Sequence, residues 1–251
     1  QSTPVTSVVP GLLAEWMSQP EMRKKLGQLK IVFCGGAPAD PALKETLKHR
    51  QIPVSYVYGA TETASMVAGT RPAVGASSIE PPAMPLPHAS FEVDADGVLW
   101  VRAESLFHGY LHDWETVMNT PPTIWKSHDY AWIGENGTLQ LLGRADHVIL
   151  TGGENLFPEE LEQVLRAHPK LDEVCVVGIP HQKWGEAVAC TYVTKSPSRL
   201  PSENELREWV RNQVATWKCP KYWLACSSLP KAKADKIQRD AVRAMIMEKI
   251  G

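Results

Sequence analysis

A strand, a helix and a second strand follow one another early in the chain, and this order restricts the fold more than any other feature. Residues 29–34 form a short apolar run. It ends at four residues that favour a turn: Gly35, Gly36, Ala37 and Pro38. Asp40 then suits the N-cap of a helix through Arg50, and a second apolar run covers residues 54–58. Because strands joined by a helix run parallel, we expect an α/β layer in residues 1–76.

A change of composition after this layer predicts a second region, residues 77–145. The stretch 73–87 is rich in Pro, Ser and Gly and has no hydrophobic period, which is typical of a loop or a boundary. Short strand signals separated by turn sequences follow at 91–93, 98–102 and 138–142. We therefore expect a small β-rich subdomain here.

The third region, residues 146–251, mixes helical and strand patterns. Its expected helices cover 158–167, 203–215 and 238–249, and its expected strands cover 173–177 and 187–193. Pro158 stands in the first turn of one helix, and Ser202 with Glu205 fits a capping box at the start of another. This pattern predicts a compact α+β domain of about one hundred residues.

Charge and cysteine content exclude several classes of protein. The formal net charge of the 251 residues is −2, which gives no electrostatic case for a nucleic-acid partner. The sequence has no apolar run of membrane-spanning length and no signal-peptide pattern, so we expect no membrane insertion. The five cysteines form no CxxC pair, and free thiols in a reducing cytoplasm are the simplest interpretation.

The segment Tyr-Gly-Ala-Thr-Glu-Thr at residues 58–63 follows a predicted strand and carries groups that suit a phosphate. Gly59 allows the backbone to approach a ligand closely. Thr61 offers a hydroxyl to a phosphate oxygen, and Glu62 offers the hard carboxylate oxygen that Mg²⁺ accepts beside phosphates. The alternative is an ordinary polar turn between a strand and a helix.

Three further segments have candidate roles. Asp129 could accept hydrogen bonds from two ribose hydroxyls, although an Asp in such a stretch is commonly a turn residue. Arg144 can fork onto a phosphate or a ribose, and Gly152 with Gly153 permits close approach or a flexible joint. The Lys-rich stretch 229–239 near the end of the chain is either a solvated surface or a source of a catalytic cation.

The order of these segments is more specific than any one of them. YGxTE, [ST]-x-D, GRxD, GGEN-x-x-PxE-[LI]-E and a Lys-rich LPK segment resemble, in this order, the ANL superfamily of adenylate-forming enzymes. That superfamily includes acyl- and aryl-CoA ligases, adenylation domains of peptide synthetases and beetle luciferases. Residues 181–186 resemble its WGE segment, and residues 97–102 with 109–111 its GEL…GYL segment. The resemblance covers nearly the whole chain and implies part of an adenylation domain followed by a small mobile C-terminal domain.

The resemblance also implies roles for individual residues. The adenine and acyl pockets would be formed in part by Gly35, Gly36, Ala37, Tyr58 and Gly59. Thr61 would contact the α-phosphate, Glu62 would bind Mg²⁺, Asp129 would hold the ribose and Arg144 would support it. Asp146 would be the hinge of the mobile domain, Gly153 would face the pantetheine of coenzyme A, and Lys236 would bridge the substrate carboxylate and the α-phosphate. The implied ligands are ATP or AMP, Mg²⁺, coenzyme A and a small carboxylic acid. Thr61, Glu62 and Lys236 are the implied catalytic residues.

The chemistry explains the need for a lysine, because a carboxylate that attacks an α-phosphate meets a second anion. A positioned ammonium neutralises the charge that builds up in the transition state. This sequence departs from the family where Asp235, rather than the usual Gly, precedes Lys236. Lys231 and Lys233 are therefore alternative candidates.

The identity of the acid and the completeness of the enzyme remain open at this stage. The family's phosphate-binding loop has no counterpart in the sequence, which begins with Gln, so we expect a longer parent enzyme and no adenylation by this chain alone. The trimmed interval between Glu62 and Asp129 and the segment at residues 6–13 resemble o-succinylbenzoate-CoA ligases of menaquinone and phylloquinone synthesis. The alternatives are an adenylation domain that loads a carrier protein and a non-catalytic remnant that binds nucleotide.

Overall fold

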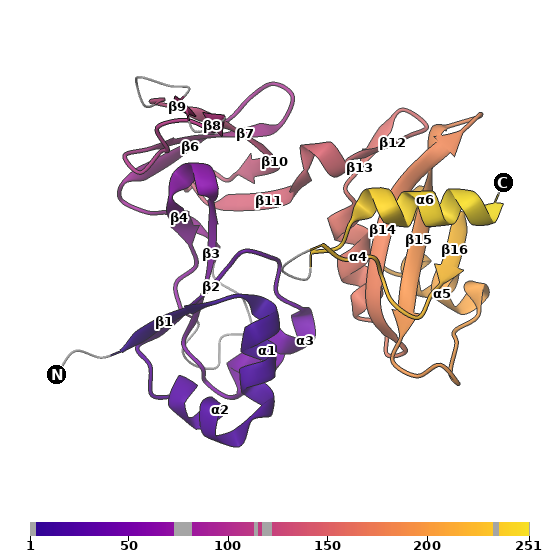
Figure 1. Ribbon diagram of the computed structural model, residues 1–251, viewed down its shortest axis with the longest axis horizontal. Coiled ribbons are helices and arrows are strands. Elements are labelled where there is room, and N and C mark those ends of the chain that lie inside the picture. The colour runs from indigo at the N-terminus through magenta and orange to yellow at the C-terminus, as the bar shows by residue number, and fades with distance from the viewer. Residues whose placement is uncertain (1–3, 73–81, 113–114, 117–121, 233–235, 251) are drawn as a thin grey trace. The chain divides into compact units, whose positions relative to one another are not determined.

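The computed structural model describes residues 4–72, 82–112, 115–116, 122–232 and 236–250 (Figure 1). The chain divides into two compact units, Gln1–Leu141 and Leu142–Gly251, called unit 1 and unit 2 below. Each unit has its own sheets, helices and hydrophobic clusters. The expected fold class, α/β followed by α+β, is confirmed.

The first sheet of unit 1 begins with three parallel strands and continues with two antiparallel ones. In sheet order, its strands are β1 (Val5–Val8), β2 (Ile31–Cys34), β3 (Val54–Ala60), β4 (Ser65–Gly69) and β5 (Met84–Pro85). The helices α1 (Pro10–Ser18), α2 (Pro20–Leu26) and α3 (Pro41–His49) connect the parallel strands. The parallel pairing of β1 with β2 and of β2 with β3 confirms the prediction from the strand–helix–strand order.

Burial and capping fix this layer. The buried side chains that join the helices to the strands are Val8, Leu13, Met17, Leu26, Val32, Cys34, Leu47, Ile52 and Val54. Asp40 caps α3 as predicted, because its carboxylate accepts hydrogen bonds from the backbone N–H groups of Ala42 (2.7 Å) and Leu43 (3.4 Å). The cap also fixes where the glycine loop after β2 turns into the helix.

The second sheet of unit 1 is antiparallel and packs against β4. Its strands are, in sheet order, β11 (Leu139–Arg144), β10 (Trp125–Ile133), β7 (Val98–Ala103) and β6 (Ala89–Val93), and β8 (Leu111–His112) pairs separately with β9 (Glu115–Thr116). Val67 and Ala68 of β4 share one buried cluster with Leu99, Val101 and Ala131 of this sheet. The β4 strand of the first sheet therefore packs on the second sheet of the unit.

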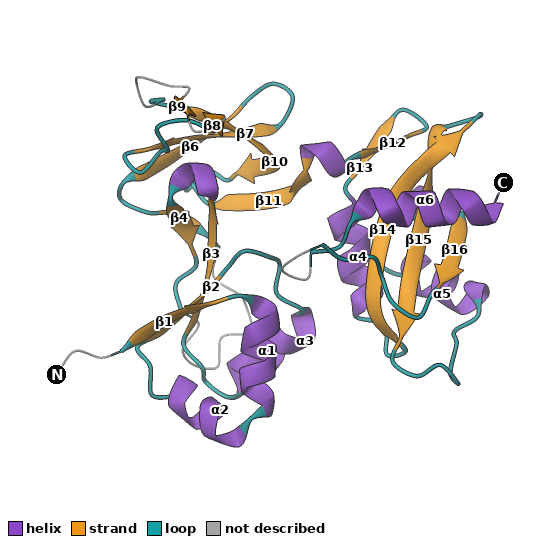
Figure 2. Cartoon of the chain, viewed as in Figure 1, coloured by secondary structure: helices purple, strands orange, loops and turns teal. Residues whose placement is uncertain are grey.

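Unit 2 is a five-stranded sheet that is covered by helices on both faces. Its strands are β12 (Ile149–Thr151), β13 (Glu154–Leu156), β14 (Leu171–His181), β15 (Gly185–Thr194) and β16 (Tyr222–Ala225). The helices α4 (Pro158–Arg166) and α5 (Glu203–Arg211) cover one face and α6 (Arg239–Ile250) covers the other (Figure 2). Along β14, Val174 and Val176 enter one cluster while Cys175 and Val177 enter the other, as the two-residue repeat of a strand requires.

A buried ion network joins α4, β14 and α6 in unit 2. Both carboxylate oxygens of Glu162 accept hydrogen bonds from Arg239, at 2.6 and 3.0 Å, and Glu162 is only 3% exposed. Glu162 also accepts from Arg166 and from the backbone N–H of Val176, both at 2.9 Å. Burial alone would lower the pKa of Arg239, but the charge of Glu162 and its hydrogen bonds raise that pKa overall.

Most predicted elements exist, and the exceptions are instructive. The helix predicted over 203–215 is shorter, since α5 ends at Arg211, but Ser202 caps it as predicted by accepting from the N–H of Glu205 at 3.2 Å. The Glu205 carboxylate accepts from Lys170. The prediction that residues 73–87 form no regular structure is wrong near the end of the stretch, where β5 forms. Residues 73–81 lie outside the described part. The sequence did not predict α2, β4, β10, β12, β13 or β16.

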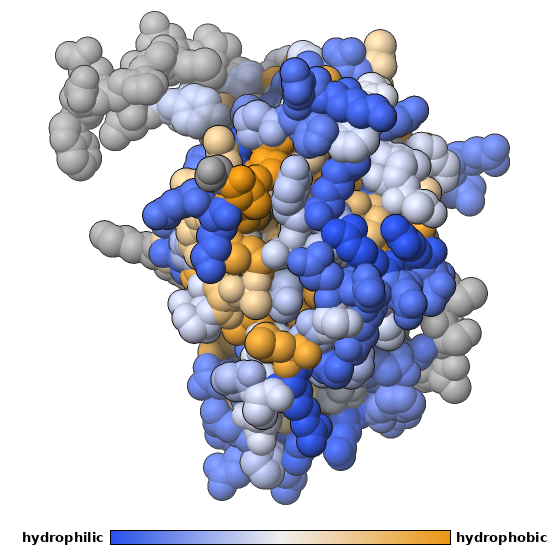
Figure 3. All heavy atoms as spheres, turned by 90° about the vertical axis from the view of Figure 1, so that its right-hand side faces the viewer, coloured by the Kyte–Doolittle hydropathy of each residue, from blue (hydrophilic) through white to orange (hydrophobic). Residues whose placement is uncertain are grey.

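Among the described residues, no helix has the length and apolar composition needed to cross a membrane. In Figure 3 hydrophilic side chains cover most of the face in view, with smaller hydrophobic groups between them. The large apolar side chains that unit 2 exposes are Leu150, Leu200, Trp217, Met247 and Ile250. Exposed apolar side chains in small groups are normal for a protein surface.

Candidate active site

The turn after β3 is built so that only glycine fits at position 59. A Cβ atom on Gly59 would lie 2.0 Å from the backbone oxygen of Ser65 and 2.8 Å from the Cα of Met66. The register of the β3–β4 pair shifts between Tyr58 and Gly59 at the same point. The close approach of the two strands therefore sets the path of the turn that carries Thr61 and Glu62.

A buried threonine holds this turn in shape. The hydroxyl of Thr63 accepts from the N–H of Ala60 at 2.9 Å and donates to the backbone oxygen of Ser65 at 2.7 Å. Thr63 is fully buried, whereas Thr61 is exposed and Glu62 is half-buried on the 3₁₀ turn Thr61–Thr63. The two candidate catalytic side chains of unit 1 thus stand on the outside of a turn whose inner side is fixed.

A tyrosine hydroxyl joins two of the predicted segments. Tyr58 donates a hydrogen bond of 2.6 Å to Oδ2 of Asp129, which lies 71 positions further along the chain. The backbone N–H of Asp129 donates to the buried hydroxyl of Ser127 at 3.0 Å. Asp129 lies within β10, so the alternative that it is a turn residue is wrong. The structure brings the predicted adenine and ribose residues into contact.

The glycine loop after β2 approaches β3. A Cβ on Gly35 would lie 2.6 Å from Cγ2 and 3.0 Å from the backbone oxygen of Val57, and Gly36 has a φ of +85°. The candidate residues 35–37 follow β2, and Tyr58 to Glu62 follow the parallel part of β3. In parallel sheets, ligands commonly bind at the carboxyl ends of neighbouring strands, where these two segments lie.

Glu62 is held by the loop that includes residues 109–111, for which the sequence had predicted no contact with Glu62. Tyr110 donates from its hydroxyl to Oε1 of Glu62 at 2.8 Å, and the N–H of Phe107 donates to the backbone oxygen of Glu62 at 2.8 Å. This hydrogen bond to the carboxylate raises the pKa of Tyr110. A single carboxylate fits Mg²⁺, because sites that transfer phosphoryl or nucleotidyl groups bind this ion through one or two carboxylates plus phosphate oxygens and water.

In unit 2, the predicted ribose support and the predicted hinge bind each other. Arg144 donates from Nε and Nη2 to the two carboxylate oxygens of Asp146, at 2.9 and 2.8 Å. These hydrogen bonds lower the pKa of Asp146 to about 2. His147 next to it contacts Oε1 of Glu159 through Nδ1 at 2.8 Å. A Cβ on Gly143 would lie 2.6 Å from the Glu159 carboxylate, so the whole segment packs against the start of α4.

Gly152 and Gly153 form the turn of the β12–β13 hairpin. Their φ values are +63° and +89°, the left-handed conformations that a two-residue hairpin turn of type I′ requires. Gly152 also donates from its N–H to the backbone oxygen of Trp184 at 2.9 Å. A Cβ on Gly153 would meet nothing within 4 Å, so conformation rather than crowding requires glycine there.

Cationic and aromatic side chains gather beside this hairpin turn, and the sequence analysis had assigned them no role. The ring of Trp184 contacts the ring of His181, at a centroid distance of 4.3 Å, and also Nζ of Lys221, at 2.7 Å from the ring centroid. Lys183 lies 5.3 Å from the same ring. Burial first, and then the charge of Lys183, lower the pKa of Lys221. The repeated Lys–Trp pattern around residues 183–184 and 217–221 was the available signal.

The candidate lysines differ in their surroundings. Lys231 forms a 2.5 Å ion pair with Glu173 of β14. The backbone of Lys231 pairs with that of Ile237, and the N–H of Ala232 donates to the backbone oxygen of Lys236 at 2.8 Å. The two ends of the segment 231–237 therefore lie side by side. Lys236 is exposed, and Lys233 and Asp235 lie outside the described residues.

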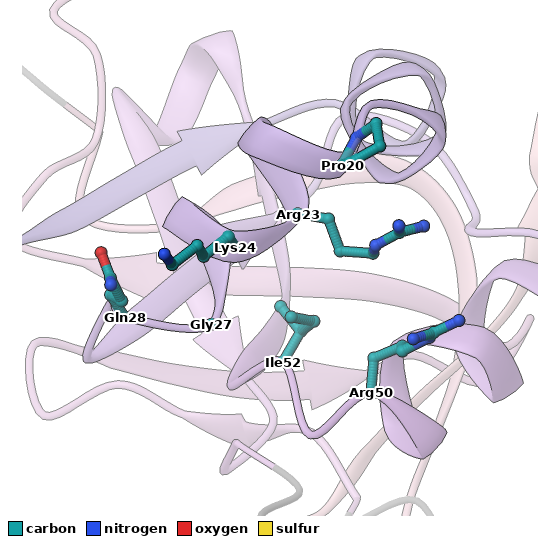
Figure 4. A pocket seen from close by; sticks show the side chains of 7 residues that line it. All are labelled: Pro20, Arg23, Lys24, Gly27, Gln28, Arg50 and Ile52. Carbon is teal, nitrogen blue, oxygen red and sulfur yellow. The ribbon is translucent and has the colours of Figure 1, made fainter.

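A shallow hollow of about 340 Å³ lies elsewhere in unit 1, between α2 and the end of α3. The side chains of Arg23 and Arg50 extend toward the same side of it (Figure 4). Arg23 also donates to the backbone oxygen of Met17 at 3.3 Å. The residues that line the hollow include none of the candidate site residues, so the site must be sought at the strand ends.

Comparisons with known proteins agree with this geometry. A family model described as AMP-binding enzyme matches residues 2–111, and a second one, AMP-binding enzyme C-terminal domain, matches residues 160–236. Together they cover most of the chain.

A 2-succinylbenzoate–CoA ligase of Listeria monocytogenes serotype 4b (strain F2365) is 32% identical over 216 residues, which are 86% of this chain and 46% of that protein. The solved o-succinylbenzoate CoA synthetase (MenE) from Bacillus subtilis, in complex with the acyl-adenylate intermediate OSB-AMP, shares the fold at a TM-score of 0.78 and 24% identity, over 95% of this chain and 50% of that one. The amide bond synthetase McbA from Marinactinospora thermotolerans matches with a TM-score of 0.78 and 27% identity, over 96% of this chain and 51% of that one. The chain therefore spans about half the length of the relatives it matches.

Proposed function

We propose, from the premise that the chain belongs to the AMP-binding enzyme family, that it forms part of an enzyme that activates a carboxylic acid with ATP and passes the acyl group to coenzyme A. The observation that carries the proposal is the hydrogen bond between Tyr58 and Asp129, since it joins two segments that are predicted to bind the nucleotide and lie 71 positions apart. The glycine loop after β2 and the Thr61–Thr63 turn lie at the carboxyl ends of the adjacent strands β2 and β3.

In the first step, the substrate carboxylate attacks the α-phosphorus of ATP, an acyl-adenylate forms and pyrophosphate leaves. We assign the ribose hydroxyls to Asp129, with support from Arg144, and a hydrogen bond to the α-phosphate to Thr61. Gly35, Gly36, Ala37, Tyr58 and Gly59 would line the adenine and acyl pockets. Bound Mg²⁺ would neutralise phosphate charge, and Glu62 would hold it.

Lys236 is our candidate for the cation that neutralises the attacking carboxylate and the α-phosphate. The ion pair of Lys231 with Glu173 of its own unit favours Lys236 over Lys231, because a lysine that must reach a substrate cannot keep that partner. Lys236 belongs to unit 2, so the proposal needs unit 2 to rotate about Asp146, as lids of other enzymes do. We retain residues 1–76, 77–145 and 146–251 as the functional divisions.

In the second step, the thiol sulfur of coenzyme A attacks the acyl carbon and AMP leaves. We propose that the open turn at Gly153 lies along the pantetheine arm. Lys183 and Lys221, which lie about the Trp184 ring beside this turn, would attract the phosphates of the coenzyme.

The names of the relatives favour o-succinylbenzoate as the acid, and with it a role in menaquinone or phylloquinone synthesis in the cytoplasm. The similarity to an amide bond synthetase shows that this fold also serves other acceptors. An adenylation domain that loads a carrier protein therefore remains the second candidate, and a nucleotide-binding remnant the third.

The test uses the full-length gene product with a panel of carboxylic acids that includes o-succinylbenzoate, and follows AMP formation with and without coenzyme A. We expect AMP and an acyl-CoA from one acid, and a loss of adenylation of about 10²–10³-fold in Lys236→Ala but not in Lys231→Ala. Lys221→Ala should raise the KM for coenzyme A and leave adenylation unchanged. Transfer to a carrier protein instead of coenzyme A would select the second candidate, and an absence of AMP with every acid would select the third.

A further inference from the structure

The loop at residues 106–110 binds the Glu62 turn at two points. The backbone N–H of Phe107 donates to the backbone oxygen of Glu62 at 2.8 Å, and the hydroxyl of Tyr110 donates to Oε1 of its carboxylate at 2.8 Å. The rings of Phe107 and Tyr110 lie edge to face, with centroids 4.9 Å apart at an angle of 63°. One residue of this loop therefore fixes the backbone of Glu62 while another fixes its side chain.

We propose that Tyr110 is a positioning residue, which holds the carboxylate of Glu62 in the orientation that binds Mg²⁺ together with the nucleotide phosphates. The inference rests on the proposed function, in which Glu62 is the metal ligand. Tyr110 itself does not bind the ion. Its hydroxyl occupies Oε1 and directs Oε2 to the cation.

The physical reason lies in the freedom of a glutamate on an exposed turn. Such a side chain loses rotamer entropy when it must meet a metal in one orientation. A tyrosine has only two side-chain torsions, and here the edge of a second ring restrains it further. Partners that orient a metal ligand typically account for a factor of about 10–100 in metal affinity.

A neutral donor suits this task better than a cation. An arginine or lysine beside Glu62 would cancel the negative charge that attracts Mg²⁺, whereas a phenol hydroxyl restrains the carboxylate and leaves its charge in place. The Tyr58–Asp129 pair has the same chemistry at the predicted ribose residue. The two pairs predict separate defects, a weaker metal interaction when the Tyr110 hydroxyl is lost and a weaker nucleotide interaction when the Tyr58 hydroxyl is lost.

The experiment compares Tyr110→Phe, Glu62→Gln and Tyr222→Phe in the full-length enzyme. Tyr110→Phe keeps the ring beside Phe107 and removes only the hydroxyl, and Tyr222→Phe removes a hydroxyl from the sheet of unit 2 as the matched control. The rate of AMP formation is measured against free Mg²⁺ at saturating ATP and acid. For Tyr110→Phe we expect the half-saturating Mg²⁺ concentration to rise about tenfold, with kcat at saturating Mg²⁺ and the KM of the acid nearly unchanged.

Two readouts do not depend on turnover. Water-proton relaxation reports how tightly Mn²⁺ binds to the enzyme with ATP in the absence of acid, and a crystal structure of Tyr110→Phe shows the Glu62 side chain. We expect weaker Mn²⁺ binding and more than one Glu62 conformer, with the urea midpoint of unfolding unchanged. Normal Mn²⁺ binding in Tyr110→Phe, with weakened binding in Glu62→Gln, overturns the inference alone. Normal binding in both variants overturns the inference together with the metal role of Glu62.

Discussion

Two carboxylates of unit 2 and the two candidate ligand-binding carboxylates of unit 1 have different kinds of partner. In unit 2, Glu162 is buried and both of its oxygens bind arginine, and Asp146 is paired with Arg144 through two hydrogen bonds. In unit 1, Asp129 and Glu62 each accept a hydrogen bond from a tyrosine hydroxyl. An arginine neutralises a carboxylate, whereas a phenol only orients it.

This difference indicates which carboxylates are available to bind a ligand. A carboxylate that an arginine has neutralised contributes to folding, and its charge is no longer available to a ligand. A carboxylate that a phenol orients keeps its charge for a metal ion or for sugar hydroxyls. The two candidate ligand-binding carboxylates are of the second kind, and those of the α4–α6 network are of the first.

The largest expected effect concerns the buried pair. Glu162→Ala removes the carboxylate that binds the buried Arg239 at 2.6 and 3.0 Å and leaves only its 3.6 Å pair with Glu159, so the free energy of unfolding of unit 2 should fall by about 3–5 kcal/mol. Hydrogen exchange of the β14 and β15 amides, together with urea unfolding, measures this loss. Glu203→Ala, which removes an exposed 3.4 Å pair with Arg207, is the control and should cost at most about 0.5 kcal/mol. A loss below about 1 kcal/mol for Glu162→Ala would break the comparison.

The second-largest expected effect tests whether the turn that carries Glu62 must be rigid. In Gly59→Ala the new methyl group overlaps the backbone oxygen of Ser65, so β3 and β4 must move apart at a cost of about 1–3 kcal/mol. Gly11→Ala is the matched control, because a Cβ there meets nothing within 4 Å. Urea unfolding and ATP binding should both weaken in the first variant and not in the second. Unchanged binding by Gly59→Ala would show that the turn need not be rigid.

A smaller effect concerns one phenol. Tyr58→Phe keeps the ring and removes the donor to Asp129, so the nucleotide should bind more weakly by about 1 kcal/mol, or roughly fivefold. Isothermal titration of the full-length enzyme with ATP measures the change. The expected change lies in ATP affinity and not in the dependence on Mg²⁺. Equal changes in ATP affinity and in the dependence on Mg²⁺ would mean that the two tyrosine pairs share one structural role.

The smallest expected effect concerns the pKa of Asp146 and its contribution to stability. Arg144 lowers the pKa of Asp146 to about 2, so the stabilisation from this pair is present above the unfolded pKa of 3.8 and is lost as the pH falls through about 2. In Arg144→Gln the pKa should return toward 3.8, and NMR of the labelled carboxyl carbon measures it. A pKa that stays near 2 in that variant would assign the shift to another cause. Because the Asp146 side chain is 50% exposed, the effect on stability is small.

Local signals made the parallel layer and the helix starts predictable from sequence. Asp40 and Ser202 cap their helices because a short side chain reaches its own backbone within two or three residues. The C-terminal end of α5 was less predictable, since the apolar pattern continues to residue 215 while the helix ends at Arg211.

The strand β10 was not predicted because its sequence does not alternate clearly between apolar and polar residues. Its two buried positions are Ser127 and Ala131, which carry little hydrophobic signal, whereas Trp132 is 56% exposed. Without this strand, Asp129 resembled a turn residue.

The candidate site was predictable as a set of segments and not as a set of contacts. The glycine loop, the Thr61–Thr63 turn and Asp129 were recognisable by their order along the chain. The phenol that binds Glu62 was not, because Tyr110 lies 48 positions from its partner and carries no local sign of that contact. Pairings of this kind arise only when the second sheet of unit 1 packs on β4 of the first.

The network on Glu162 also sets an order of events in biosynthesis. Glu162 lies 77 positions before Arg239 and is therefore translated earlier than this partner. A nascent chain that stops short of α6 therefore keeps Arg166 as a charged partner of Glu162, lacks Arg239 and leaves one face of the sheet uncovered. The synthesis of α6 therefore completes two things together, the second arginine contact of Glu162 and the cover of that sheet face.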